Sequence, residues 1–365
     1  MPGKDPTSDR NSRALGRSSI HPSLTIEHLF GDPRPFAQCH APTIVALEGR
    51  AALAAWFGGT REGHDDVAIW AARSDPISAA TRPDSLFGAG WSEPIQIAKV
   101  SDEPHWNPVL FALSPGGRDL VLHFKVGRRI RHWVTWSKRS RDAGQSWQDA
   151  RPLVAEGRGG RGAVRSKPIR LASGAWLAGA SLERWRRWDV FFDRSENGED
   201  GWIATPLVEI DRRRFRGKGL IQPTLWESSP GRVHALFRST DGRVHRSDSD
   251  DDGLTWSRAR ALDLPNNNSG LDLARLPNGT LALACNPVPG NWAARTPLSV
   301  LFSRDGGESW PGRIDIETSS GEFSYPALIA DGDDLALAYT WNRRRIAFVR
   351  LPRERIEDAC ASSPA

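Results

Sequence analysis

Three copies of one short pattern, S-x-D-x-G-x-[ST]-W, constrain this chain more than any other feature of its sequence. They run over residues 140–147, 249–256 and 303–310. In each copy, acidic and small polar residues lead into a Gly that tolerates positive φ, and a Ser or Thr and a Trp then begin an extended segment. One such turn would mean little, but three in one chain indicate a structural repeat.

The Trp that closes each copy sets the period of the repeat. Degenerate copies at Trp91 and Trp202 fall between the full ones, so that the series Trp91, Trp147, Trp202, Trp256 and Trp310 has spacings of 56, 55, 54 and 54 residues. A near-constant period of about 50 residues is typical of propeller blades.

Each period contains short apolar or alternating segments bounded by Gly, Pro or Asn-Gly, which is typical of strands. We expect four strands in each period, with the repeated pattern in the turn between the third and the fourth. After the fourth strand of the fifth blade only three strands remain, and residues 24–30 supply the missing one. This pairing of the two chain ends closes the ring and leaves no exposed sheet edge. The sequence therefore predicts an all-β fold, a six-bladed β-propeller of four-stranded antiparallel blades.

The ends of the chain are expected to lie outside this domain. Residues 1–22 are polar and basic and lack the apolar stretch of a secretory signal, so we predict a flexible tail, then a single propeller domain over 23–352 and a C-terminal tail over 353–365. Three scattered cysteines have neither disulfide-framework nor zinc-ligand spacing, which favours a cytoplasmic setting. No apolar run approaches the roughly 20 residues of a membrane span, and we expect no membrane partner.

The net charge of +5 and the isoelectric point near 9.4 raise the question of an anionic partner. Only six of the 49 basic residues are Lys, so the charge reflects a general preference for Arg. The Arg residues are dispersed and no RNA-binding signature is present, so we expect no nucleic-acid partner.

The repeated pattern matches the Asp box of the sialidase (neuraminidase) superfamily. The chain resembles the bacterial predicted neuraminidases with bacterial neuraminidase repeats, from about His40 to Ile346, through CHAPTI, AAWFGGTREG, WNPVLF, FKVG, SKPI, QPTLW, LPNNNSG, YPALI and YTWNRRRI. The expected role of the boxes is structural: the Asp caps the turn through local hydrogen bonds and the Trp fills the space between sheets. This role applies to Asp142, Trp147, Asp251, Trp256, Asp305 and Trp310.

The site residues of a propeller come from the starts of the first strands and from nearby loops, which converge on one mouth. In the first blade, His40 stands where sialidases carry an Arg of their carboxylate-binding triad. The resemblance places the acid/base Asp in the following loop, at Asp65 or Asp66, and Arg61 there is a candidate for binding an anionic group. The alternatives are a solvated, self-paired loop and a structural inner-strand His.

Two lysines are further candidates because Lys is rare in this chain. Lys125 and Lys167 fall at expected inner-strand positions, where an ammonium group can meet a carboxylate or take part in proton transfer. The alternative is that each stem packs on an apolar wall with its head in water.

The later blades supply the rest of the predicted site. The resemblance implies that Arg238 and Arg295 are the second and third Arg of the triad and that Tyr325 is the nucleophile. Gln222 falls where a sialidase has the Glu that activates the Tyr. A Tyr with an ordinary pKa of about 10 needs such a base at neutral pH, and Glu322 is an alternative source. His40 and Gln222 are thus two departures from the family pattern.

Three functions fit these residues. The first is a sialidase-like glycoside hydrolase acting on a terminal anionic sugar, such as sialic acid. The second is a uronate-specific polysaccharide lyase, in which Arg or Lys neutralises a carboxylate while His40 or Tyr325 removes the α proton. The third is a non-catalytic glycan-binding propeller. In all three the partner is an anionic carbohydrate. We expect neither a cofactor nor a metal, and the sequence does not indicate an oligomeric state.

Overall fold

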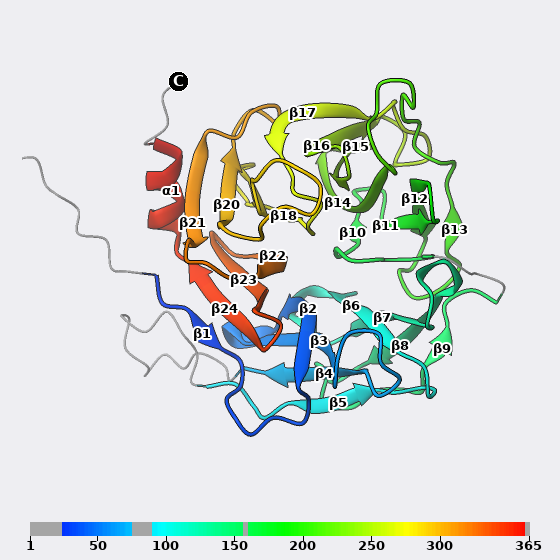
Figure 1. Ribbon diagram of the computed structural model, residues 1–365, viewed down its shortest axis with the longest axis vertical. Coiled ribbons are helices and arrows are strands. Elements are labelled where there is room, and N and C mark those ends of the chain that lie inside the picture. Colours follow the sequence, from blue (N-terminus) through cyan, green and yellow to red (C-terminus); the bar gives the residue numbers. More distant parts are fainter. Residues whose placement is uncertain (1–23, 75–89, 156–159, 362–365) are drawn as a thin grey trace, which may run out of the picture.

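Six four-stranded antiparallel sheets are arranged around a central axis in the computed structural model of the chain (Figure 1). The structure describes residues 24–74, 90–155 and 160–361. In each of the first five blades the strands pair in chain order. The prediction of a six-bladed β-propeller is confirmed.

The first strand of each blade lies nearest the axis, and β2 contacts both β6 and β22 there (Figure 1). The strands of blades one to three are β2 (Gln38–Ala46), β3 (Ala52–Gly59), β4 (Ala68–Arg73), β5 (Ile95–Ala98), β6 (His105–Ala112), β7 (Leu120–Val126), β8 (Val134–Ser140), β9 (Arg151–Pro152), β10 (Ile169–Arg170), β11 (Trp176–Glu183), β12 (Trp188–Ser195) and β13 (Ile203–Ala204). Those of blades four to six are β14 (Leu220–Ser229), β15 (Arg232–Ser239), β16 (Arg243–Ser249), β17 (Arg260–Pro265), β18 (Asp272–Arg275), β19 (Leu281–Cys285), β20 (Leu298–Ser303), β21 (Gly312–Glu317), β22 (Phe323–Asp331), β23 (Asp334–Trp341) and β24 (Arg345–Leu351), with β1 (Glu27–His28) as the outer strand of blade six.

The ring is closed by the two ends of the chain. Strand β1 pairs antiparallel with β24, with Glu27 opposite Phe348 and His28 opposite Ala347. The blue and red ends of the ribbon lie side by side in Figure 1. The sequence assigned this strand to residues 24–30, and the observed pairing uses the centre of that segment.

The Trp of each box packs on the blade that precedes it. Trp256 stacks on Phe192 of blade three, with ring centroids 3.9 Å apart. The degenerate copies do the same, because Trp202 meets His123 of blade two and Trp91 meets Phe348 of blade six. A large aromatic side chain at every period therefore fills the wedge between successive blades, which explains why the spacing of the Trp residues reports the blade count.

Beyond the last strand, the sequence predicts a tail from residue 353, but the structure has a helix, α1 (Arg353–Ala361). The buried side chain of Ile356 joins the apolar core of blades five and six, so these residues pack on the propeller. The short 3-10 helices are η1 (Glu48–Arg50), η2 (Pro115–Gly117) and η3 (Ile130–His132). The predicted N-terminal tail lies outside the described residues. No helix among the described residues is long and apolar enough to cross a membrane.

Antiparallel pairing gives the propeller two chemically different ends. The front end carries the starts of the first strands and the loops that join second to third strands, which are residues 60–67, 127–133, 184–187, 240–242, 286–297 and 342–344. The back end carries the turns between first and second strands and the Asp boxes, which join third to fourth strands.

Candidate active site

Four first strands carry the same irregularity near the front end. In β2, β6, β14 and β22 the register shifts where a residue with positive φ precedes a proline. These residues are Ala41, Asn107, Gln222 and Tyr325, with φ of 54°, 41°, 53° and 53°. A bulge re-aims the side chain it carries, although positive φ in a non-glycine residue costs about 1 kcal/mol or more. The strained positions include both Gln222 and Tyr325, which the sequence selected as site residues.

The phenol of Tyr325 meets the guanidinium of Arg238 across the axis. Arg238 Nη1 donates to Tyr325 Oη at 2.8 Å and to Gln222 Oε1 at 3.0 Å. Its Nε donates to Asn268 Oδ1 at 2.7 Å. Arg238, Gln222 and Asn268 are all buried, so the position of this guanidinium is set by neutral acceptors from two different blades.

Three cations surround the ring of Tyr325. The guanidinium carbons of Arg165, Arg295 and Arg238 lie 5.1, 5.5 and 5.7 Å from the ring centroid. Burial raises the pKa of the phenol, but the charges of Arg238 and Arg295 outweigh it, so the pKa lies below its ordinary value. This tyrosine therefore forms a phenolate more readily than a tyrosine in water, without a carboxylate as its base.

Arg165 lies beneath Tyr325 and is fully buried. It donates to the carbonyl oxygens of Pro42 at 3.2 Å and Pro326 at 2.7 Å, which are the prolines of two bulges. Burial lowers its pKa to about 10, which leaves it charged at neutral pH. Within the described residues neither Arg165 nor Arg238 forms a direct ion pair with a carboxylate, although the charge of Asp272 acts on Arg165 from a greater distance.

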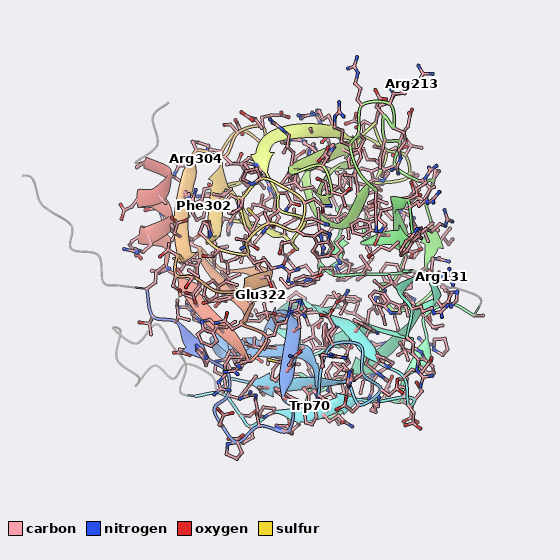
Figure 2. All side chains as sticks on the ribbon, in the orientation of Figure 1. Trp70, Arg131, Arg213, Phe302, Arg304 and Glu322 are labelled. Atoms are coloured by element: carbon pink, nitrogen blue, oxygen red, sulfur yellow. The ribbon has the colours of Figure 1, made fainter. Side chains whose placement is uncertain are left out.

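A second layer of charge lies closer to solvent. Arg295 Nη1 donates to Glu322 Oε1 at 2.7 Å, and Arg343 Nε donates to the same oxygen at 2.9 Å. Arg343 also forms an ion pair with Glu62, from the loop after β3. The side chains of Arg295 and Arg343 are 13% and 25% exposed, so an incoming ligand can reach them. Figure 2 shows Glu322 close to the centre of the ring of blades.

His40 packs its imidazole on Tyr325, with ring centroids 4.2 Å apart. Its Nδ1 lies 2.9 Å from Thr340 Oγ1. Burial, reinforced by the charges of Arg343 and Arg295, holds the pKa of His40 well below its ordinary value. The imidazole is therefore neutral at pH 7 and is available as a proton acceptor rather than as a cation.

Trp292 forms part of the outer rim of this cluster. Its side chain is 63% exposed, and the guanidinium of Arg238 lies 5.6 Å from its ring centroid. The neighbouring Asn291 accepts a hydrogen bond from Asn268 Nδ2 at 2.8 Å. An exposed aromatic face beside buried donors suits a sugar ring, which can stack on the indole while its polar groups reach the axis.

The structure brings half of the predicted site residues together at the axis: His40, Gln222, Arg238, Arg295 and Tyr325. The other candidates of the first blade lie in its exposed loop. Asp65 pairs with Arg128 at 2.8 Å, and Asp66 accepts from Thr60 N and Oγ1 at 2.8 and 2.7 Å. Arg61 is exposed in the same loop. Among the described residues, the carboxylate of this loop that pairs with an axial arginine is Glu62.

Lys125 lies away from the axis, buried between blades two and three. Its Nζ donates to Thr135 Oγ1 at 2.8 Å and to the carbonyl oxygen of Arg161 at 2.6 Å. Burial lowers its pKa to about 7, against the opposing charge of Asp193. This lysine is held within the blade stack and does not contact the Tyr325 cluster.

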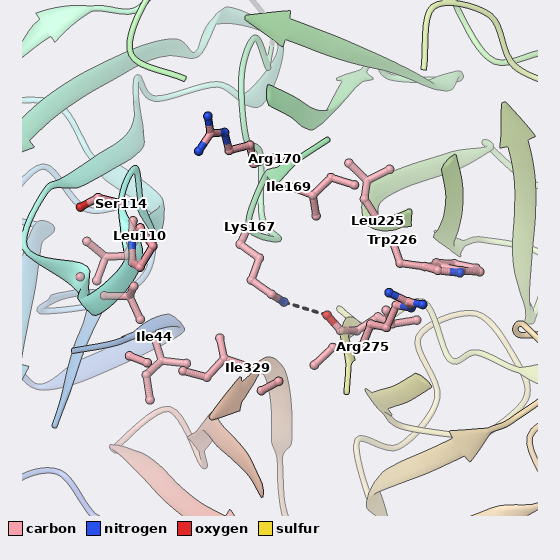
Figure 3. Close-up of a pocket in the computed structure, with 18 of the residues that line it drawn as sticks. Ile44, Leu110, Ser114, Lys167, Ile169, Arg170, Leu225, Trp226, Arg275 and Ile329 are labelled. Atoms are coloured by element: carbon pink, nitrogen blue, oxygen red, sulfur yellow. Dashed lines mark hydrogen bonds between the residues drawn. The ribbon is translucent and has the colours of Figure 1, made fainter. Parts of the chain in front are cut away.

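Lys167 lies in a pocket of about 530 Å³ at the back end of the axis. Its Nζ donates to Asp272 Oδ2 at 3.0 Å and to the carbonyl oxygen of Leu273 at 2.8 Å. Figure 3 shows the side chain extending into this pocket, with the apolar residues Ile44 and Ile329 to one side of it. Its charge is matched by a buried carboxylate, unlike those of Arg165 and Arg238.

Sequence reasoning did not select Glu62 and Arg165. The sequence gives neither residue a distinguishing signal, because Glu62 stands among several charged residues of one loop and Arg165 is one of many arginines. The rule that first-strand starts converge pointed to Lys167 and could have been extended to Arg165, two residues earlier. Arg343 belongs to a run of three arginines at positions 343–345, a pattern that is equally typical of a solvated face.

The Asp boxes have the local hydrogen bonds that the sequence predicts. Asp251 accepts from Thr255 N at 2.9 Å, from Thr255 Oγ1 at 2.5 Å and from Ser249 Oγ at 2.8 Å. Similar bonds from Ser146 lower the pKa of Asp142 to about 2. In the described part of the chain, no group of three or more His, Cys, Asp or Glu side chains is arranged to hold a metal ion.

Known proteins share both the repeat and the fold. The sequence matches the BNR repeat-like domain family over residues 50–337. A search of curated proteins finds no match. Among solved structures, a variant of the NanB sialidase of Streptococcus pneumoniae is 13% identical with a TM-score of 0.71, over 93% of this chain and 72% of that one.

Two further structures extend the comparison. The intramolecular trans-sialidase of Ruminococcus gnavus, in complex with oseltamivir carboxylate, is 13% identical with a TM-score of 0.66, over 90% of this chain and 97% of that one. A Hadza microbial sialidase is 13% identical with a TM-score of 0.70, and the chain covers 66% of its length. At such identities the likeness shows the fold. The family match, which spans most of the propeller, confirms the resemblance drawn from the Asp boxes: this chain belongs to the BNR repeat-like domain family and has the sialidase fold.

Proposed function

We propose that the protein is a glycoside hydrolase that removes a terminal anionic sugar, with Tyr325 as its nucleophile. The observation that carries the proposal is the phenol of Tyr325, which accepts a hydrogen bond from Arg238 and lies beside Arg165 and Arg295, with its pKa lowered by the charges of Arg238 and Arg295. A nucleophile needs either a neighbouring base or a lowered pKa. The arginines lower the pKa of Tyr325, whereas Gln222, which has no carboxylate, cannot act as a neighbouring base.

The preference for an anionic sugar follows from the unmatched charge. Four arginines reach the cluster, at positions 165, 238, 295 and 343, and among the described residues they form ion pairs with only two carboxylates, Glu62 and Glu322. Arg295 and Arg343 converge on one oxygen of Glu322 from two blades. A carboxylate on the sugar would take donors from both guanidinium groups, which bind planar anions with two parallel hydrogen bonds.

The proposed reaction proceeds in two steps. Tyr325 Oη attacks the anomeric carbon, the bond to the leaving oxygen breaks, and a carboxyl group protonates that oxygen. Water then attacks the anomeric carbon and gives its proton to the ionised carboxylate while the bond to Tyr325 Oη breaks, so that the product keeps the configuration of the substrate. Glu62 is assigned as the acid, because it is the carboxylate of the first-blade loop that pairs with an axial arginine, whereas Asp65 and Asp66 have partners elsewhere.

A second reaction is favoured by one observation, the contact of the neutral His40 with Tyr325. In a uronate lyase the arginines neutralise the carboxylate, His40 removes the α proton and the tyrosine protonates the leaving oxygen. This reaction needs no carboxylate beside the phenol, and in the described structure the hydrogen-bond partner of Tyr325 Oη is Arg238.

Product analysis tests both reactions. The protein is incubated with a fluorogenic sialoside and with uronate-terminated oligosaccharides, and the products are followed by fluorescence, ultraviolet absorbance and NMR. Hydrolysis releases the free sugar with retained configuration, whereas elimination gives an unsaturated uronide that absorbs in the ultraviolet. Arg295→Ala should raise KM for the anionic substrate. The matched control, Arg170→Ala at the back end, should leave KM unchanged, and equal effects of the two variants would contradict the anion-binding role.

A further inference from the structure

A second pocket opens at the front end, outside the Tyr325 cluster. It has a volume of about 630 Å³ and lies between blades two and three. One wall is formed by Arg131 and His132, from the loop after β7, and the other by residues 182–187, at the end of β11 and in the loop after it. Figure 2 shows Arg131 toward the rim, on the opposite side of the axis from α1.

The pocket carries more positive charge than its own carboxylates can match. Asp189 is almost fully buried. Its carboxylate forms ion pairs with Arg187 at 2.8 Å, with Arg212 at 2.6 Å and, less closely, with Arg184 at 3.9 Å. Arg131 and Arg186 form no ion pair with any described residue. Because each guanidinium has five donors, the arginines around this pocket keep free donors for an anion.

An exposed aromatic ring lies among these charges. Trp185 is 81% exposed, the largest exposed fraction among the large apolar side chains of the described residues. Lys218 Nζ lies 5.6 Å from its ring centroid and 5.5 Å from that of Trp188, so one cation lies close to both indoles. A flat apolar face next to a dense group of cations suits a sugar ring that carries a negative charge.

Glu183 connects this pocket to the catalytic cluster. Its carboxyl group lines the pocket and lies within the electrostatic reach of Arg238, the arginine that holds Tyr325. Burial raises its pKa, and the charge of Arg238 only partly opposes this.

We infer that this pocket is a subsite for a second anionic residue of the substrate, next to the terminal sugar bound at Tyr325. The ligand class is an acidic oligosaccharide whose following residue bears a carboxylate or a sulfate, bound by Arg131 and Arg186 and stacked on Trp185. The inference rests on the proposed function, because it assumes that the terminal sugar binds at the axis.

Calorimetric titration of the full chain tests the subsite without turnover. The Tyr325→Phe variant is titrated with three oligosaccharides of equal length: one with carboxylates, one with sulfates and one neutral. Adding Arg131→Gln and Arg186→Gln to this variant should weaken binding of the charged ligands by about a hundredfold or more, because each of the two lost charged hydrogen bonds is worth about a factor of ten or more. Binding of the neutral ligand should not change.

Controls separate this subsite from general charge effects. The paired substitutions Arg170→Gln and Arg275→Gln remove the same charge at the back end and should not alter affinity. Whichever charged ligand loses more affinity in the Arg131 and Arg186 variant identifies carboxylate or sulfate. Equal losses in the control pair, or tighter binding of a single-stranded RNA than of either oligosaccharide, would overturn the inference.

Failure of the subsite and failure of the proposed function give different results. If a single-sugar reporter is cleaved but the affinity for acidic oligosaccharides does not depend on Arg131 and Arg186, the subsite is wrong and the hydrolase stands. If no substrate is turned over but those arginines still control affinity, the subsite stands as a glycan-binding site and the hydrolase is wrong.

Discussion

The buried cations at the two ends of the propeller axis have different partners. At the back end, Lys167 is paired with the buried Asp272, whose carboxylate also accepts from Thr224 Oγ1 and Leu328 N. At the front end, Arg165 and Arg238 have only neutral acceptors within the described structure.

This difference indicates that Lys167 has a structural role, whereas Arg165 and Arg238 are available to a ligand. A buried charge without a counterion lowers the stability of the empty protein, so its presence at one end needs a reason other than folding. The charge of Arg238, together with that of Arg295, lowers the pKa of Tyr325. The following four changes test the contrast, from the largest expected effect to the smallest.

Removing the phenol oxygen should have the largest effect. Tyr325→Phe should lower kcat by about a thousandfold or more, because it deletes the attacking atom, and should leave the unfolding transition nearly unchanged. The chain has one other tyrosine, Tyr339, whose hydroxyl donates to Glu317 at 2.7 Å in blade six. Tyr339→Phe is the matched control and should keep its activity. Equal activity of the two variants would remove Tyr325 from the site.

Removing the ammonium group at the back end should affect stability instead. Lys167→Met leaves Asp272 buried and without its counterion, which should lower the free energy of unfolding by about 3 kcal/mol in urea titrations. The double variant with Asp272→Asn should recover most of the loss. The folded Lys167→Met protein should keep its kcat, and a loss comparable to that of Tyr325→Phe would contradict the division between the two ends.

Adding a carboxylate at the front end should move the pH dependence. Gln222→Glu places a negative charge beside Arg238 and Tyr325, which should raise the pKa of the phenol by about one unit. The phenolate then forms at higher pH, so the acid limb of kcat/KM should shift upward by about one pH unit. Gln222→Met, which adds no charge, should shift it less. A downward shift in the Glu variant would show that the arginine charges do not set the pKa of Tyr325.

Deleting one box carboxylate should have the smallest effect. Asp251→Ala loses the bonds from Thr255 and Ser249, and should lower the free energy of unfolding by about 1 kcal/mol with no change in kcat. The control is Asp250→Ala, because Asp250 is 83% exposed and has only a surface pair with Arg232. Its expected cost is below about 0.5 kcal/mol, as for other surface substitutions. A change in turnover of the Asp251 variant would assign the boxes a chemical role.

Much of the site could be predicted because the repeat fixes where strands begin. Residues that precede prolines at the starts of first strands, such as Gln222 and Tyr325, meet at the axis whatever their neighbours are. The first-blade loop was harder to interpret, since it offers Glu62, Asp65 and Asp66 within five positions. Thr60 binds Asp66 locally, and Arg128 of the next blade binds Asp65.

Lys125 and Lys167 show a second reason why parts of the site could not be predicted from the sequence. Lys125 lies on β7, the second strand of its blade, where alternate side chains point to the two faces of the sheet. The strand pattern alone does not show how far such a side chain lies from the axis. Lys167 lies at the other end, because β10 is only two residues long and pairs with the back-end start of β11. Because Lys is rare in this chain, both lysines could be recognised as unusual. Their rarity did not indicate where in the fold they lie.

The sequence by itself determined the number of blades, their strand content and the closure of the ring. These depend on local turn chemistry and on a Trp at each period, and both repeat along the chain. Only the tertiary structure decided which charges meet. The partners of Arg238 come from positions 222, 268 and 325, and electrostatic interactions depend on distance in space and on burial rather than on separation along the chain.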